Sequence, residues 1–206
     1  MSGSPITLIA HDLKNALGSL ESQLAALVDT PSAESAQAAH QHCMALRQQF
    51  IQFLTLYGND GALRPYCEDE SPHDTLASLA RQGQARHLGR SGAPQVVLDP
   101  CIEAPPYWYY DTRLVQMALD AALHNASRFA HSQITLSARQ QQGFLVFQID
   151  DDGPGLGAPD TSSVSTGLGT QLCHAVAQAH RSGERQGRVV LRNRPEGGAR
   201  FELWLP

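Results

Sequence analysis

The sequence predicts an α+β protein, in which a helical hairpin precedes a domain with a layer of helices on a mixed, mostly antiparallel sheet. Three observations support this prediction. Apolar residues recur every three or four positions through the first sixty residues, which is a helical period. From about residue 75 onward, helical segments alternate with segments of period two, which is the period of strands. A stretch rich in glycine, proline and acidic residues separates the two parts.

Two apolar seams predict the hairpin. The first consists of Ile6, Ala10, Leu13, Leu17, Leu20, Leu24 and Leu27, and it ends at Asp29-Thr30-Pro31. The second consists of Ala36, Ala39, Cys43, Leu46, Phe50, Phe53 and Tyr57, and Gly58-Asn59-Asp60-Gly61 is expected to end it, since glycine is free to take the left-handed cap. A lone hairpin leaves part of its apolar stripe in water. We therefore expect a homodimer that forms a four-helix bundle through residues about 5–58.

A cluster of polar side chains lies near the start of the first helix. His11 follows the seam residue Ala10, so it is expected on the flank of the seam, facing water or a partner. Asp12 beside it could hold the imidazole tautomer or take up a proton. Asn15 lies four residues after His11 and shares its helix face. Taken alone, this cluster could equally be a solvated helix face that contains a histidine.

The sequence divides into three parts: the hairpin at 1–60, a linker at 61–74 and a second domain at 75–206. This domain is expected to begin with a short helix from Thr75 to about Gly83, followed by a strand over 95–99. Asp111-Thr112 could cap a longer helix whose apolar face contains Leu114, Ala118, Ala121, Ala122 and Ala126.

The rest of the second domain follows a strand pattern interrupted by one helix. Alternating residues over 134–138 and 145–149 predict an antiparallel pair, joined around 140–143. A helix is expected from about Thr170 to Ala179, after a glycine-rich loop. The segments 189–191 and 201–205 should then form a hairpin around 195–198.

Three stretches of this domain contain side chains suited to binding a nucleotide. Asp150-Asp151-Asp152-Gly153-Pro154-Gly155 ends a strand, and adjacent carboxylates need a dedicated donor or cation. Thr166-Gly167-Leu168-Gly169-Thr170 begins a helix, where free amides suit phosphate. Asn125 and Arg128 are three apart on a helix; an amide oxygen suits magnesium and a guanidinium suits phosphate. A plain turn or a capped helix end is the alternative for each stretch alone.

Taken in order, these stretches resemble the core of a bacterial two-component sensor histidine kinase. His11-Asp12-Leu13-Lys14-Asn15 resembles the phosphoacceptor box of that family. Asn125-Ala126-x-Arg128-Phe129 resembles its N box, Asp151-x-Gly153-x-Gly155 its G1 box, and Gly167-Leu168-Gly169 the centre of its G2 box. The resemblance covers nearly the whole chain. It implies a dimerisation and phosphotransfer hairpin followed by an α/β-sandwich ATP-binding domain of the type shared with gyrase and MutL.

The resemblance also implies a role for each of these residues. His11 would take the γ-phosphate of ATP, with Asp12 as general base, and Asn15 would assist dephosphorylation of the regulator. Asn125 would bind Mg²⁺, Arg128 a phosphate, and Asp151 the adenine amine, while Gly153, Gly155, Gly167, Leu168 and Gly169 would surround the nucleotide. Phosphate would then pass to an aspartate on a response-regulator receiver domain.

The chain departs from the family pattern at three places. Ala121 stands where a further asparagine is common, Ser165 replaces the leading glycine of the G2 box, and the lid loop from Leu156 to Thr166 is short and lacks aromatic residues. Weaker nucleotide capture is therefore expected. The alternatives are an ATP-independent dimeric phosphotransferase relay, and a module that inhibits or dephosphorylates a regulator through Asn15.

Composition limits the other classes of function. A net charge of −5 argues against a nucleic-acid surface, and no apolar run approaches the roughly 20 residues that span a bilayer. The four cysteines lack the spacing of a metal site, which favours a reducing cytoplasm. We expect a cytoplasmic kinase without a signal peptide, a receiver or a sensor of its own, so that any signal would arrive through a separate sensor protein.

Overall fold

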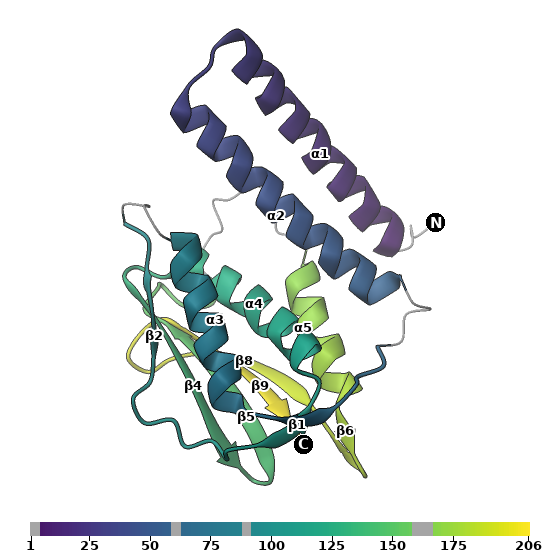
Figure 1. Cartoon of the computed structure of the whole chain (residues 1–206), viewed down its shortest axis with the longest axis vertical. Coiled ribbons are helices and arrows are strands. Elements are labelled where there is room, and N and C mark those ends of the chain that lie inside the picture. Colours follow the sequence, from purple (N-terminus) through teal and green to yellow (C-terminus); the bar gives the residue numbers. More distant parts are fainter. Residues whose placement is uncertain (1–4, 59–62, 88–91, 158–166) are drawn as a thin grey trace. The chain divides into compact units, whose positions relative to one another are not determined.

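The computed structural model describes residues 5–58, 63–87, 92–157 and 167–206, and it divides the chain into two compact units (Figure 1). One unit contains residues 1–62 and 164–168, and the other contains 63–163 and 169–206. Residues 68–70 form a paired strand and a helix begins at Pro72. The described part of the segment expected to be a linker therefore belongs to the second unit.

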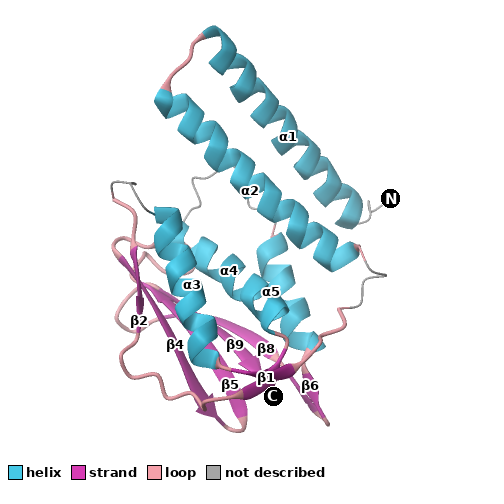
Figure 2. Cartoon of the chain, in the orientation of Figure 1, coloured by secondary structure: helices cyan, strands magenta, loops and turns pink. Residues whose placement is uncertain are grey.

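The first unit is the predicted antiparallel hairpin of α1 (Pro5–Asp29) and α2 (Ala33–Tyr57) (Figure 2). Ser32 caps α2, because its side chain accepts a hydrogen bond from the amide of Ser35. The core of the hairpin consists of Ile9, Leu13, Ala16 and Leu20 from α1, with Ala39 and Leu46 from α2. Gly58 has a right-handed φ of −78° and donates to the carbonyl of Leu54, so it does not form a left-handed cap; Gly61, the other glycine of the expected helix end, lies outside the described residues.

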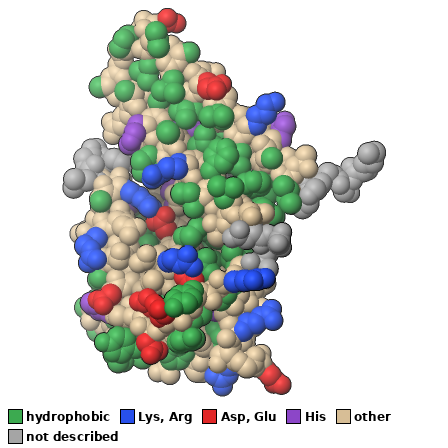
Figure 3. Space-filling view, turned by 45° about the vertical axis from the view of Figure 1, so that its right-hand side comes forward, with side chains coloured by type: hydrophobic (Ala, Val, Ile, Leu, Met, Phe, Trp, Pro, Cys, Tyr) green, Lys and Arg blue, Asp and Glu red, His purple; other side chains and the backbone are tan. Residues whose placement is uncertain are grey.

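The apolar residues of α1 form two neighbouring stripes, and the predicted seam has residues in both; Ile9 and Ala16 were not part of it. Ile9, Leu13, Ala16 and Leu20 are buried against α2, whereas Ile6, Leu17 and Leu24 are 44%, 43% and 50% exposed. Hydrophobic side chains are visible on the surface of the hairpin in the upper part of Figure 3. An a/d pattern is wide enough to serve an intramolecular contact and a second contact beside it. The hairpin alone uses only the first of these stripes.

The second unit is built on a five-stranded sheet with the order β2-β4-β5-β9-β8. Its strands are β2 (Gln95–Leu98), β4 (Gln133–Gln141), β5 (Phe144–Asp151), β8 (Arg188–Asn193) and β9 (Ala199–Leu205). β2 runs parallel to β4, and every other pair is antiparallel. Helices α3 (Pro72–His87), α4 (Thr112–Phe129) and α5 (Leu168–Ala179) lie on one face (Figure 1). The expected helix layer on a mixed sheet is confirmed.

The alternation of strand residues decides which face of the sheet meets the helices. On β4, β5 and β9 the apolar set on this face is Ile134, Leu136, Ala138, Leu145, Phe147, Ile149, Leu203 and Leu205, all at most 2% exposed. On α4, Asp111 is the predicted N-cap, and its carboxylate accepts from the amides of Arg113 and Leu114. The hairpins expected around 140–143 and 195–198 are also present.

Three features of this unit differ from the prediction. α3 does not end near Gly83 but continues to His87. A Cβ at Gly83 would lie 3.0 Å from Leu123 and 3.1 Å from Val96, so this glycine allows close helix packing instead of ending the helix. The short pairs β1 (Glu68–Glu70) with β3 (Trp108–Tyr110), and β6 (Arg181–Ser182) with β7 (Arg185–Gln186), were not predicted. Strands of two or three residues carry no readable period.

No helix in the described ranges combines the length and the hydropathy needed to cross a bilayer.

Candidate functional site

The side chains of His11 and Asn15 lie together on the exposed flank of α1. The His11 side chain is 63% exposed, and its Nδ1 lies 3.1 Å from the Asn15 amide nitrogen and 3.7 Å from Oδ1 of Asp12. Rotation of the Asn15 amide would present its oxygen instead, so Asn15 can donate to Nδ1 or accept from it. Nδ1 is thereby engaged by neighbours on the helix, and within the described residues no hydrogen bond involves Nε2.

The three adjacent carboxylates at the end of β5 are each satisfied differently. Asp150 points to the face of the sheet opposite the helices, where two guanidinium nitrogens of Arg200 donate to it at 2.8 and 2.7 Å. The hydrogen bond from this guanidinium to Asp150 raises the pKa of Arg200. The dedicated cation expected for one of these carboxylates is therefore Arg200.

Asp152 connects β5 to the segment between α4 and β4. Its carboxylate accepts from the amides of His131, Ser132 and Gln133, and from the hydroxyl of Ser132 at 2.5 Å. Partial burial would raise the pKa of Asp152, but the hydrogen bonds from Ser132 and the backbone amides hold it well below its usual range. This carboxylate is structural, because it fixes the chain directly after α4.

Asp151 is the carboxylate that can accept a further hydrogen bond. It is 6% exposed, and its Oδ1 accepts from the amides of Gly153 at 2.9 Å and Ala199 at 3.2 Å. Arg194 donates to its main-chain carbonyl at 2.7 Å. Both hydrogen bonds that reach this carboxylate from the described residues use Oδ1. Oδ2 is thus an oriented, largely buried acceptor that can receive a donor from a ligand.

The glycines after Asp151 allow the chain to approach itself closely. A Cβ on Gly153 would lie 2.3 Å from the carbonyl oxygen of Phe129, at the end of α4. Gly155 has φ +86°, and a Cβ there would lie 2.7 Å from Oδ1 of Asn193. That oxygen accepts from the amide of Leu156. The two glycines therefore fix the loop between the end of α4 and the β8–β9 turn, before any ligand is considered.

The other predicted residues lie at the two helix ends. Asn125 is exposed in the last turns of α4, and the guanidinium carbon of Arg128 lies 5.4 Å from the centre of the Phe129 ring. Leu168 and Gly169 are in the first turn of α5, and Gly167 before them has φ +68° with open space at its Cβ position. Ser165 and the lid residues 158–166 lie outside the described residues.

Among the described residues, few side chains at this end of α4 could bind a metal ion. In the described parts of the chain, no group of three His, Cys, Asp or Glu side chains could hold a metal. The exposed amide of Asn125 offers one hard oxygen, which fits a Mg²⁺ that takes its remaining ligands from phosphates and water. Mg²⁺ binding by Asn125 remains a prediction.

Sequence reasoning missed the contribution of the β8–β9 turn. Asn193, Arg194 and Gly198 meet the loop after β5: Asn193 binds Leu156, and Arg194 binds the carbonyl of Asp151. Gly198 has φ +83°, and a Cβ there would lie 1.9 Å from the same carbonyl. The residues Gly197-Gly198 predicted a turn, but they did not predict the contact of this turn with the end of β5. The two segments are more than forty residues apart in the sequence.

The β8–β9 turn offers a matched pair of glycine variants. Gly197 and Gly198 both have positive φ, but a Cβ on Gly197 meets nothing within 4 Å. We expect Gly197→Ala to cost about 1 kcal/mol of unfolding free energy from backbone strain alone. Gly198→Ala adds the collision with Asp151 and should cost at least about 3 kcal/mol. Urea unfolding of both variants measures this difference, and equal losses would show that the turn does not press on Asp151.

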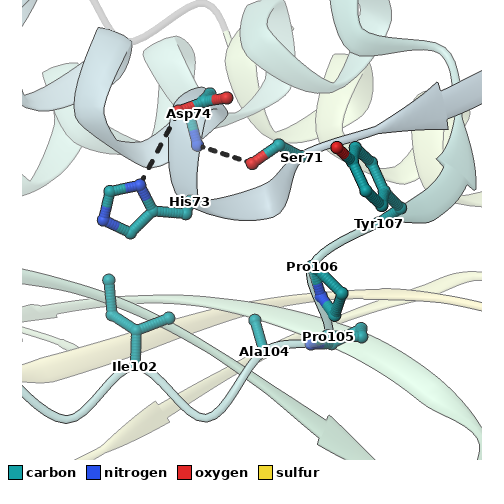
Figure 4. A pocket seen from close by; sticks show the side chains of 8 residues that line it. All are labelled: Ser71, His73, Asp74, Ile102, Ala104, Pro105, Pro106 and Tyr107. Carbon is teal, nitrogen blue, oxygen red and sulfur yellow. Dashed lines mark hydrogen bonds and ion pairs between the residues drawn. The ribbon is translucent and has the colours of Figure 1, made fainter.

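A separate cavity of about 350 Å³ lies between the start of α3 and the segment before β3 (Figure 4). Ser71, His73, Asp74, Ile102, Ala104, Pro105, Pro106 and Tyr107 line it. The Ser71 hydroxyl already caps α3 by accepting from the amide of Asp74, and His73 faces Asp74 at 3.7 Å. No residue of the predicted motifs lines this cavity.

Comparisons with known proteins agree with this geometry. Residues 110–206 match the family model described as "Histidine kinase-, DNA gyrase B-, and HSP90-like ATPase". The sensor histidine kinase CpxA of Escherichia coli K12 is 29% identical over 114 residues, which cover 48% of this chain and 24% of CpxA. The chain thus spans about a quarter of the length of the first curated relatives it matches.

Solved histidine kinases share the fold. The structure of AdeS from Acinetobacter baumannii has a TM-score of 0.69 at 21% identity, covering 95% of this chain and 96% of that one. Full-length ShkA in complex with AMPPNP has a TM-score of 0.62 at 18% identity, covering 98% of this chain and 45% of ShkA. Residues 110–206 therefore match the ATPase family shared by histidine kinases, DNA gyrase B and HSP90, and the chain has the fold of solved histidine kinases.

Proposed function

We propose that this chain autophosphorylates on His11 from Mg²⁺-bound ATP and passes the phosphoryl group to an aspartate of a response-regulator receiver. The observation that carries the proposal is the Asp151 carboxylate, which is buried and fixed through Oδ1 while Oδ2 stays open to a donor. A relay that only shuttles phosphate has no use for such an acceptor. The nearby amide of Asn125 and the first turn of α5 add the polar groups that a nucleotide needs.

The nucleotide would be bound by groups from three elements. Oδ2 of Asp151 would accept a hydrogen bond from the exocyclic amine of adenine. This amine is a neutral donor, and a carboxylate is a strong acceptor for it. Asn125 would place its oxygen on Mg²⁺, Arg128 would contact a phosphate, and the amides at Gly167, Leu168 and Gly169 would face the phosphates at the start of α5. Gly153 and Gly155 would shape the wall beside adenine. Bound Mg²⁺ neutralises the charge that develops on the phosphates.

The chemistry on α1 requires a lone pair on Nε2 of His11. In a neutral imidazole this places the ring proton on Nδ1, which faces Asp12 and the rotatable amide of Asn15. Nε2 would attack the γ-phosphorus, the bond from phosphorus to the bridging oxygen would break, and ADP would leave. The Nδ1 proton would pass to Asp12 or water, which leaves a phosphohistidine whose imidazole ring is neutral and whose phosphoryl group is anionic.

The same face of α1 would serve the regulator. A receiver domain that docks over His11 would take the phosphoryl group onto its aspartate. Asn15, one turn after His11 and within hydrogen-bonding distance of its ring, would orient a water that hydrolyses the aspartyl phosphate and releases inorganic phosphate. A kinase and a phosphatase role would therefore share one exposed helix face.

We further propose that the hairpin forms a homodimer through the second stripe of α1, in which Leu17 and Leu24 are about half exposed. Introducing Leu17→Glu with Leu24→Glu should convert the dimer to a monomer, because four charges would be buried at one interface. Leu8→Glu is the matched control, since Leu8 is 65% exposed and lies two and a half turns from Leu17, on the opposite side of the helix. Light scattering after size-exclusion chromatography measures the mass. A monomeric parent protein at micromolar concentration would contradict the proposal.

A second function is favoured by one observation. Ala121 is 2% exposed and offers only a methyl group where the family often has another asparagine. A domain with one magnesium-ligating amide could have lost ATP turnover and kept the relay or phosphatase role of His11 and Asn15. Incubation with γ-labelled ATP and Mg²⁺ separates the two. Acid-labile label that EDTA prevents supports the kinase, whereas no label and no ATP binding by calorimetry supports the relay.

A further inference from the structure

Several arginine side chains lie on the face of the sheet opposite the helices. The strand register places Arg139, Val146, Trp204 and Arg188 in one row across the sheet, and Asp150, Arg200 and Arg192 in another. Between them lies a row that contains Glu202 and Val190. In these rows four guanidinium groups accompany two carboxylates, in a chain whose net charge is −5.

The arginines are held in place by stacking and by shared carboxylates. The guanidinium carbon of Arg188 lies 4.0 Å from the centre of the Trp204 ring and 4.8 Å from that of Phe144. Glu202 is only 2% exposed and accepts from both Arg139 and Arg192, at 2.8 and 2.9 Å. One carboxylate between two guanidinium groups leaves positive charge over. Most of the donors of Arg188 and Arg192 remain available at this face.

The charge gathers at an edge that is open for pairing. β8 ends the order of the five-stranded sheet, and no strand of the described residues pairs on its far side. Along β8 the side chains alternate: Arg188 and Arg192 share the arginine face, and Leu191 points to the helix face with 52% of its surface exposed. An exposed edge strand of this kind can accept a further strand.

We propose that β8 binds an extended segment of another protein, alternately acidic and apolar, as a sixth strand. Carboxylates on alternate residues of that segment would pair with Arg188 and Arg192, and its apolar side chains would cover Leu191. A second copy of β8 in the register that overlaps the two strands most evenly is disfavoured. Symmetric antiparallel pairing centred on Val190 would set Arg188 opposite Arg192, and like charges directly opposite repel. The proposal does not rest on the proposed roles of Asp151 and His11.

The test uses the whole chain and a blocked peptide of alternating Glu and Val. We expect saturable binding that weakens with salt, together with slower amide exchange along β8 in NMR spectra. A Lys-Val peptide should not bind, and the same Glu and Val residues in two separate blocks should bind without protecting β8. Equal protection by the block peptide would overturn strand addition, and so would the absence of binding by the alternating peptide. Binding of phosphatidylglycerol vesicles alone would reassign the surface to lipid.

Two variants and a control locate the contact. Arg188→Gln with Arg192→Gln should weaken the alternating peptide about tenfold. Leu191→Glu should weaken binding of the alternating peptide comparably, through the other face of β8. Because Leu191 is half exposed, this variant should fold, and it tests the site even if the two arginines are needed for folding. Arg81→Gln, an exposed arginine on α3, removes a charge elsewhere and should leave binding unchanged. The site would be refuted if the Arg81→Gln control lost binding. It would also be refuted if the β8 variants bound the peptide as tightly as the parent protein.

Discussion

His11→Gln is expected to reduce the incorporation of acid-labile phosphate from γ-labelled ATP by at least about 100-fold, because glutamine has no nucleophilic ring nitrogen. The side chain is 63% exposed and lies outside the hairpin core, so the variant should fold and dimerise normally. ATP affinity should also be unchanged, since the proposed nucleotide groups belong to α4, the loop after β5 and the start of α5. The experiment measures the label incorporated from γ-labelled ATP and the stability of the labelled protein in acid and in base.

His40→Gln is the matched control for this variant. His40 is an exposed histidine on α2 of the same hairpin, so its replacement tests whether loss of any surface histidine lowers labelling. Full labelling in this control and none in His11→Gln identifies the acceptor. Acid-labile label that persists in His11→Gln would show that another residue is phosphorylated. A deficit in ATP binding by the same variant would place His11 in the nucleotide site instead.

Asp151→Asn is expected to weaken ATP binding about 100-fold, or about 3 kcal/mol. The asparagine oxygen can accept the same hydrogen bonds from the amides of Gly153 and Ala199. The NH₂ group of the asparagine then occupies the position of Oδ2. Adenine would then meet a donor where it needs an acceptor. Isothermal titration calorimetry with a non-hydrolysable ATP analogue and Mg²⁺ gives the change directly.

The control for this variant is Asp74→Asn, which removes the same charge from a carboxylate that is 84% exposed at the start of α3. It should leave nucleotide affinity unchanged. The dimer mass and the urea midpoint of Asp151→Asn should stay close to those of the parent, which separates a binding defect from unfolding. Unchanged ATP affinity in a folded Asp151→Asn protein would show that the assignment of adenine to this carboxylate is wrong.

Local patterns predicted the elements that depend on one segment at a time. The alternation along β4 and β5 identified the buried face, because every second residue must meet the helices. Asp111 was recognisable as the cap of α4 from its place before an apolar helix face. The neighbouring positions of His11 and Asn15 also followed from the helical period, and the structure confirms their contact.

Contacts between distant segments were not predictable in the same way. Gly83 looked like a helix end, but its role is to let α3 approach Leu123 and Val96. The seam of α1 looked like one stripe until α2 covered part of it. The pairing of β1 with β3 joins residues about forty positions apart, and three-residue strands carry too little pattern to announce a partner.

The hairpin, the helix layer on the sheet, and the family boxes were predictable from the chain alone, because these features depend on local period, capping and glycine placement. The different roles of the three carboxylates at the end of β5 depend instead on contacts between distant segments. Asp150 meets Arg200, Asp152 holds the chain after α4, and Asp151 keeps one oxygen open. Their identical chemistry gave no means of ranking them by local pattern, and only the family resemblance pointed to Asp151. The difference in their contacts arises mainly from Arg200 and Ala199 on β9 and from Ser132 before β4, which lie about twenty to fifty residues away along the chain.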